Sequence, residues 1–151
     1  MSATATAVQQ DAFRTFSEIE GLIQRFEAKT LPRAEWTHQA HLAVACWYLV
    51  CHPEAEAIRR IRSGILAYNE AHGVITTKER GYHETMTLFW AKMIRHFLSS
   101  STLDCSLVTL FNELLARYDD KNLPFTYYSR SLLLSWEARS DWVAPDIRPL
   151  P

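Results

Sequence analysis

Three histidines and one glutamate stand where helical spacing could bring their side chains together. His38 and His41 open the segment WTHQAHLAVACWYLVC, and His83 and Glu84 lie in GYHETMTLFW. Residues three apart on an α-helix share one face, so His38 and His41 can point to the same place. An apolar stripe follows His83 at helical steps, which predicts that its side chain also faces the core.

A buried polar group without a partner costs about 1 to 3 kcal/mol. Three inward imidazoles and a carboxylate must therefore satisfy one another, bind a metal, or bind water and substrate. Neutral imidazoles suit Fe, Zn, Cu or Ni, and three protein ligands with one open position are typical of a catalytic metal site. We predict that His38, His41 and His83 bind one divalent transition metal. Glu84 is then a fourth ligand, a hydrogen-bond acceptor for a ligand, or a general base.

The function expected from this site is that of a metal-dependent enzyme acting on a small-molecule substrate. Hydrolytic, lyase and oxygen-using chemistry all stay open. One alternative is a metal-free isomerase, lyase or cyclase in which His38, His83 and Glu84 exchange protons with the substrate. Another is a non-catalytic helical module that binds a ligand or forms a homodimer. Trp36 and Thr87, which lie close to the histidines in the sequence, are candidate substrate contacts.

The C-terminal segment YYSRSLLLSWEARSDWVAPDIRPLP mixes aromatic rings with arginines and aspartates. A fixed guanidinium can bind a carboxylate or a phosphate through two hydrogen bonds. We favour the structural interpretation, in which the tryptophans anchor this segment and the charges pair at the surface. Arg139 and Tyr128 are kept as candidate substrate ligands.

The elements that must position these residues are predicted to be helices. Gly is scarce, at four residues, and turn signals are widely spaced, so we expect an all-α fold. The apolar spacing predicts a bundle of five main helices, at about residues 11–29, 37–51, 52–73, 83–99 and 103–120. The second helix is apolar on every face and should be central. Residues 121–131 are expected to form a loop, Ser129 or Ser135 to cap one or two short helices, and the final prolines to keep an extended tail.

The composition fits one globular domain. The chain has 151 residues, 48% of them hydrophobic, so we expect a single helical domain over residues 11–151 after a flexible N-terminal tail, residues 1–10. Sixteen basic and seventeen acidic residues give a net charge of −1, which argues against nucleic acid as a partner. The longest apolar run is about half of the roughly 20 residues that a membrane span needs, so no membrane is expected and a cytoplasmic location is. The three cysteines are interpreted as small buried hydrophobic residues.

Three segments together resemble an uncharacterised family of small helical bacterial proteins. LPRAEWTHQAHLAVACWYL, GYHETMTLFW and EARSDWVAPDIRPL match segments of the form W/F-T-H-x-A-H-L, Y-H-E-T and W-V-x-P-D in that family. The similarity spans about residues 20 to 150. It implies that His38, His41, His83 and Glu84 belong to one site, but it implies no activity, cofactor or substrate.

Overall fold

The computed structural model describes residues 11–101 and 105–151, and within them the chain is all-helical with no strand. This confirms the predicted fold class. The predicted N-terminal tail, residues 1–10, lies outside the described residues. The helices are α1 (Phe16–Glu27), α2 (His38–Cys51), α3 (Glu54–Ala71), α4 (Glu84–Ser100), α5 (Leu107–Arg117), α6 (Pro124–Tyr127), α7 (Arg130–Leu133) and α8 (Trp136–Ser140), and a 3₁₀ turn, η1 (Arg33–Glu35), precedes α2.

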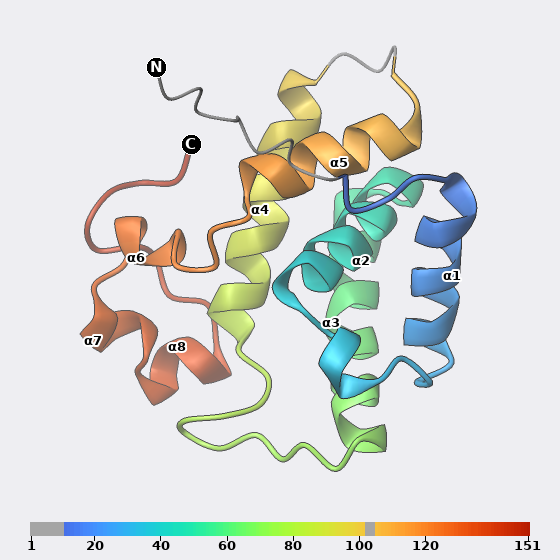
Figure 1. The fold of residues 1–151 in the computed structure, drawn as a ribbon. Coiled ribbons are helices and arrows are strands. Elements are labelled where there is room, and N and C mark those ends of the chain that lie inside the picture. The colour runs from blue at the N-terminus through green and yellow to red at the C-terminus, as the bar shows by residue number, and fades with distance from the viewer. Residues whose placement is uncertain (1–10, 102–104) are drawn as a thin grey trace, which may run out of the picture.

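Helix α2 lies at the centre of the molecule and packs against α1, α3, α4 and α5 (Figure 1). Its side chains from Leu42 to Cys46 are buried on every side, as the continuous apolar run predicted. The hydroxyl of Thr37 accepts a hydrogen bond from the backbone N–H of Ala40 and so caps the first turn. His38 and His41 therefore stand at one end of the core.

The C-terminal third of the chain packs beside α4 (Figure 1). The predicted loop at residues 121–131 is wrong in part, because Pro124 begins the short helix α6, where its missing N–H costs nothing. The predicted caps are confirmed: Ser129 caps α7 and Ser135 caps α8, each through its hydroxyl. These short helices bring Arg139 against the start of α4.

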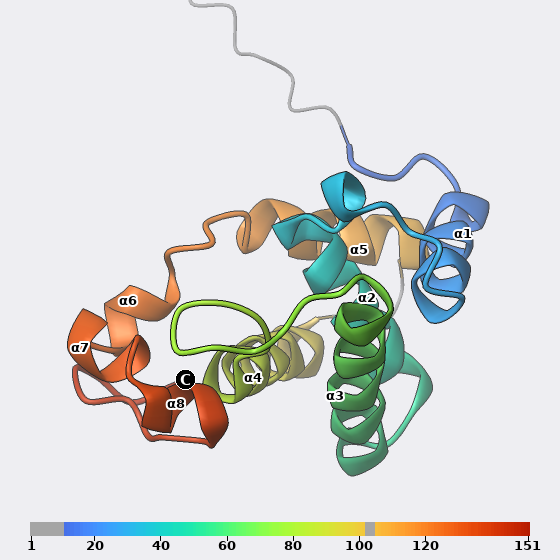
Figure 2. The same cartoon turned by 90° about the horizontal axis from the view of Figure 1, so that it is seen from below.

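The segment between α3 and α4 forms a long loop that passes one end of the helices (Figure 2). Gly73 and Gly81 have φ values of +69° and +89°, a region that favours glycine. A side chain at Gly81 would also meet the backbone of Thr76, 2.7 Å from the site of its Cβ. The loop thus turns back on itself before entering α4 at His83.

The cysteines differ from one another. Cys46 is buried in α2, and burial raises the pKa of its thiol to about 12. Cys51 and Cys105 are exposed, so their interpretation as buried hydrophobic residues is wrong. The first lies in the last turn of α2, which emerges from the core, and the second precedes α5.

No helix within the described ranges combines the length and the apolar character needed to cross a membrane.

Candidate functional site

A pocket of about 450 Å³ opens between α2, α3, the first turns of α4 and the α3–α4 loop. His38, His41 and His83 all border it, so we call it the histidine pocket. The volume falls in the range of small-molecule sites. Trp36 and Thr87, the two predicted substrate contacts, also border it.

Two of the three imidazoles have one ring nitrogen without a hydrogen bond. A carbonyl oxygen can only accept, so His38 Nε2 donates to the Tyr118 carbonyl (2.8 Å) and His41 Nδ1 donates to the Thr37 carbonyl (2.7 Å). The other nitrogens, His38 Nδ1 and His41 Nε2, make no hydrogen bond within the described chain. Fully buried side-chain nitrogens and oxygens there all have partners, so these two nitrogens are accessible.

Burial makes His41 a neutral imidazole. Desolvation is the main cause that lowers the pKa of His41 to about 4; the hydrogen bond to Thr37 opposes it, and the positive charge of Arg33 adds to the lowering. The indole of Trp36 stacks on its ring at a centroid distance of 3.7 Å. His41 is thus fixed in orientation and tautomer, with an unprotonated Nε2 at neutral pH.

His83 has a structural role. Its Nδ1 accepts the backbone N–H of Met86 (3.1 Å) and so caps α4, while its Nε2 donates to the carbonyl of Leu133 (2.8 Å). Burial lowers the pKa of His83, which keeps the ring neutral. Since both ring nitrogens are occupied by the backbone, neither is free for a metal or a proton.

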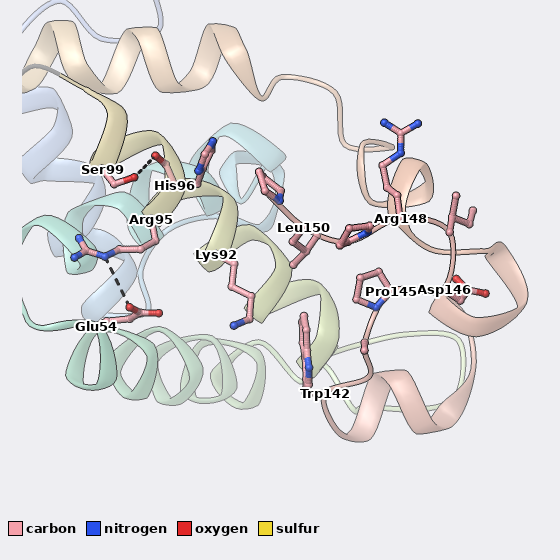
Figure 3. A pocket seen from close by; sticks show the side chains of 14 residues that line it. Glu54, Lys92, Arg95, His96, Ser99, Trp142, Pro145, Asp146, Arg148 and Leu150 are labelled. Carbon is pink, nitrogen blue, oxygen red and sulfur yellow. Dashed lines mark hydrogen bonds and ion pairs between the residues drawn. The ribbon is translucent and has the colours of Figure 1, made fainter.

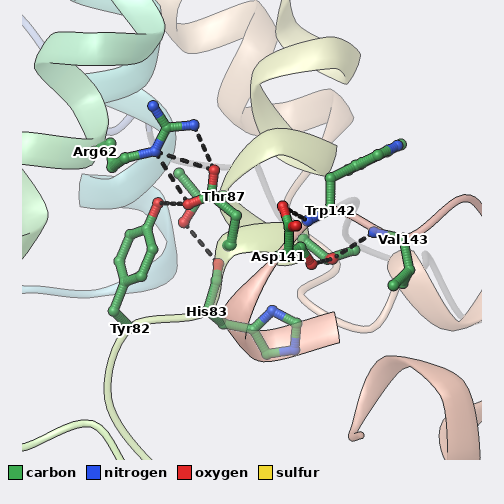
Figure 4. Close-up of polar contacts among 9 residues, drawn as sticks. Arg62, Tyr82, His83, Thr87, Asp141, Trp142 and Val143 are labelled. Carbon is green, nitrogen blue, oxygen red and sulfur yellow. Dashed lines mark hydrogen bonds and ion pairs between the residues drawn. The ribbon is translucent and has the colours of Figure 1, made fainter. Parts of the chain in front are cut away.

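Glu84 is tied to α3 rather than aimed at a substrate. Its carboxylate accepts two N–H groups of Arg62 and the hydroxyl of Tyr82 at 2.6 Å, and Figure 4 shows the polar ends of Arg62 and Tyr82 close to each other. Burial alone would raise the pKa of Glu84, but the hydrogen bonds from Arg62 and Tyr82 outweigh it and lower the pKa. Glu84 does not border the pocket, so its predicted role as general base is not supported. It holds Tyr82 in the pocket wall instead.

The donor set does not fit the predicted metal site. Among the described residues, no group of three or more His, Cys, Asp or Glu side chains could hold a metal ion. His83 is capped and bonded by the backbone, and Glu84 is bound to Arg62. The remaining pair, His38 and His41, completes no coordination sphere.

Arg139 and Tyr128 lie outside the pocket. Arg139 is buried and donates to the carbonyls of Lys78, Gly81 and Tyr82, at 3.1 to 3.3 Å. Tyr128 is fully buried and donates to the carbonyl of Val143 at 2.8 Å. Their predicted contact with substrate is therefore not supported. Arg139 instead fastens the α3–α4 loop, which forms one wall of the pocket.

Besides Tyr82, four polar residues that border the pocket were not predicted from the sequence: Arg33, Asn69, Arg80 and Lys121. They come from η1, the end of α3, the α3–α4 loop and the turn after α5. No local pattern links them, because each lies in a separate segment. The sequence feature that could have pointed to one of them was the position of Arg33, three residues before the predicted substrate contact Trp36.

A second hollow of about 750 Å³ lies between α4 and the C-terminal segment (Figure 3). Its cations are already engaged: Lys92 lies 5.1 Å from the ring centre of Trp142, and Arg95 lies 3.8 Å from Glu54. Of the predicted site residues, none borders this hollow. It is an open groove, and the histidine pocket is the better candidate site.

Comparisons with protein-family models, with curated proteins and with solved structures found no match to this chain. The family resemblance of the three sequence segments therefore stays a prediction.

Proposed function

We propose that the chain is a metal-free acid–base enzyme that acts on a small organic molecule in the histidine pocket. The observation that supports this most is the unpartnered Nε2 of His41, an acceptor held in one orientation inside a pocket of about 450 Å³. Of the alternatives that the sequence left open, this one needs no third ligand. It differs from the sequence prediction in its proton carrier, which is His41 rather than His83 or Glu84.

The proposed step is a proton transfer within the enzyme–substrate complex. His41 Nε2 takes a proton from an acidic C–H or O–H of the substrate and becomes an imidazolium whose Nδ1–H stays bonded to Thr37. The imidazolium then returns the proton to another substrate atom, which completes an isomerisation, or to a leaving group, which completes an elimination. His38, whose Nδ1 also makes no hydrogen bond within the described chain, lies on the same wall.

The test is proton exchange in D₂O. A panel of aryl ketones and 2-oxo acids is screened for binding through the fluorescence of Trp36 and Trp90, which border the pocket. Compounds that bind are then followed by proton NMR for replacement of the C–H next to the carbonyl by deuterium. We expect His41→Asn to abolish exchange and to keep binding, because an amide at the Nδ1 position still donates to Thr37. Added EDTA should change nothing.

Three results would contradict the proposal. Exchange that persists in His41→Asn would remove His41 as the proton acceptor. Exchange that is lost with EDTA and restored by a divalent metal would show that the reaction depends on a bound metal. Binding without exchange for every bound compound would leave a ligand-binding module, the third function that the sequence allowed.

A further inference from the structure

The wall of the histidine pocket carries three basic side chains, and no carboxylate of the described chain lines it. Arg33, Arg80 and Lys121 border it, and within the described chain no Asp or Glu does. None of the three forms an ion pair within residues 11–101 and 105–151. The chain as a whole has a net charge of −1, so this local excess is specific to the pocket. All three side chains are exposed, where they meet an anion that arrives from solvent.

The interior of the same pocket is apolar and partly aromatic. Trp36 stacks on Phe26 at 4.7 Å as well as on His41, and Trp90 lies 4.8 Å from the ring of His38. Side chains of isoleucine and methionine complete this wall. Aromatic side chains that are held in place in a pocket wall favour a flat apolar body in the ligand.

Asn69 adds an unpartnered polar group at the end of α3. Its side chain is only 8% exposed and borders the pocket, yet its amide makes no hydrogen bond within the described chain. Since no sealed side-chain nitrogen or oxygen in the described chain lacks a partner, the amide atoms of Asn69 are accessible from the pocket, where a ligand can bind them. The amide offers both a donor and an acceptor, whereas His41 Nε2 offers only an acceptor. A ligand that satisfies both must carry a hydrogen-bond donor.

We propose that the substrate of this pocket is a small aromatic anion, a carboxylate or a phosphate ester that also carries a hydroxyl or amide donor. The side chains of Arg33, Arg80 and Lys121 bind the anionic group of the substrate. The tryptophans contact its ring, and His41 and Asn69 accept hydrogen bonds from its donor. The inference rests on the proposed function, because it names the substrate class for the same pocket. An anion bound near Arg33 would also offset the charge that weakens His41 as a base.

The experiment compares three matched probes: 3-hydroxybenzoate, 3-hydroxyphenyl phosphate and the neutral 3-hydroxybenzamide. Dissociation constants are measured by tryptophan fluorescence and by NMR. We expect at least one anion to bind about tenfold more tightly than the amide at low salt. Arg33→Gln and Arg80→Gln should each weaken anion binding about fivefold and leave amide binding unchanged. The control is Arg59→Gln, which removes the same charge from a side chain of α3 outside the pocket.

The outcomes separate the two proposals. Equal affinity for the amide and both anions, or no binding of either anion at about 10 mM, would overturn the anion assignment. The same is true if Arg59→Gln weakens binding as much as Arg33→Gln. The proton-transfer function fails separately, when His41→Asn leaves exchange intact. A preference for the benzoate or for the phosphate identifies which anion the pocket takes.

Discussion

Individual side chains in the histidine pocket differ in which nitrogen they expose. His41 donates from Nδ1 and keeps Nε2 free, while His83 uses both nitrogens for the backbone. The difference comes from the backbone carbonyls and the N–H group that each ring contacts. It leaves His41 with a free acceptor nitrogen, whereas His83 caps a helix. Two histidines that look alike in the sequence therefore have different chemistry.

The pKa of His41 makes stability depend on pH. The pKa falls from 6.5 to about 4 on folding, so the unfolded chain binds the proton more readily between those values. The free energy of unfolding should therefore decrease as the pH falls from 6.5 towards 4, by at most about 3 kcal/mol from this residue. Urea denaturation across this range, with NMR titration of the histidines, measures it. His41→Asn should remove this part of the slope; a titration of His41 near pH 6.5 would contradict the prediction.

The cap formed by His83 gives a second prediction at this scale. His83→Ala loses the acceptor for Met86 and the donor to Leu133, so we expect it to destabilise the fold by about 2 kcal/mol. His83→Asn can still cap α4 and should lose only about half as much. Urea denaturation compares the two. Equal losses would show that capping is not the role of this ring.

At the scale of elements, the α3–α4 loop is held by features on both of its sides. Two left-handed glycines shape the turns, and Arg139 on α8 binds three of its carbonyls. The loop supplies Arg80 and Tyr82 to the pocket wall. The short C-terminal helices thus position the pocket without touching it.

The role of Arg139 can be tested by amide hydrogen exchange. Arg139→Gln removes the guanidinium group that binds the carbonyls of Lys78 and Gly81. We therefore expect the amide hydrogens of residues 74–82 to exchange with solvent about tenfold faster. Binding of 3-hydroxybenzoate should weaken, since the wall carrying Arg80 loosens. Arg148→Gln changes an exposed arginine of the same C-terminal segment and should affect neither. Unchanged loop exchange in Arg139→Gln would contradict this role.

The two loop glycines provide a matched pair. Gly73→Ala should destabilise the fold only by the free energy of placing alanine in the left-handed backbone region, about 1 to 2 kcal/mol, because its Cβ meets open space. Gly81→Ala has the same backbone cost and also brings its Cβ to 2.7 Å from the backbone of Thr76, so it should be clearly more destabilising. Thermal denaturation of both variants checks the order. The reverse order would show that the turn at Gly81 can shift without cost.

Taken as a whole, the molecule builds its pocket from parts far apart in the sequence. The wall includes residues from η1 to Lys121, and α2 packs against four other helices at its centre. The pocket exists only in the complete fold. A ligand that binds there must therefore stabilise the whole domain and not one segment.

This coupling predicts a shift in the melting temperature. 3-Hydroxybenzoate at 100 times its dissociation constant should stabilise the fold by about 2.7 kcal/mol, which for a chain of this length raises Tm by several degrees. The Arg33→Gln, Arg80→Gln double variant at the same ligand concentration should show a smaller rise, because its occupancy is lower. Differential scanning calorimetry measures both. Equal rises would mean that the probe binds elsewhere.

The sequence by itself determined where the five longer helices lie. The spacing of apolar residues predicted five main helices, and Ser129 or Ser135 was predicted as a cap, because helical periodicity and capping depend on neighbours within about four residues. The sequence also predicted that His38 and His41 lie in the first turn of the most buried helix. These features are local, so one segment contains all the information they need.

Only the tertiary structure decided what each polar side chain does. The carbonyls that bind His38 and His83 lie 80 and 50 residues away in the chain, and Arg139 meets a loop about 60 residues before it. Arg33, Arg80 and Lys121 converge on one pocket from separate segments. A side chain's chemistry depends on which partners reach it after the helices pack, and spacing along the sequence does not contain that information.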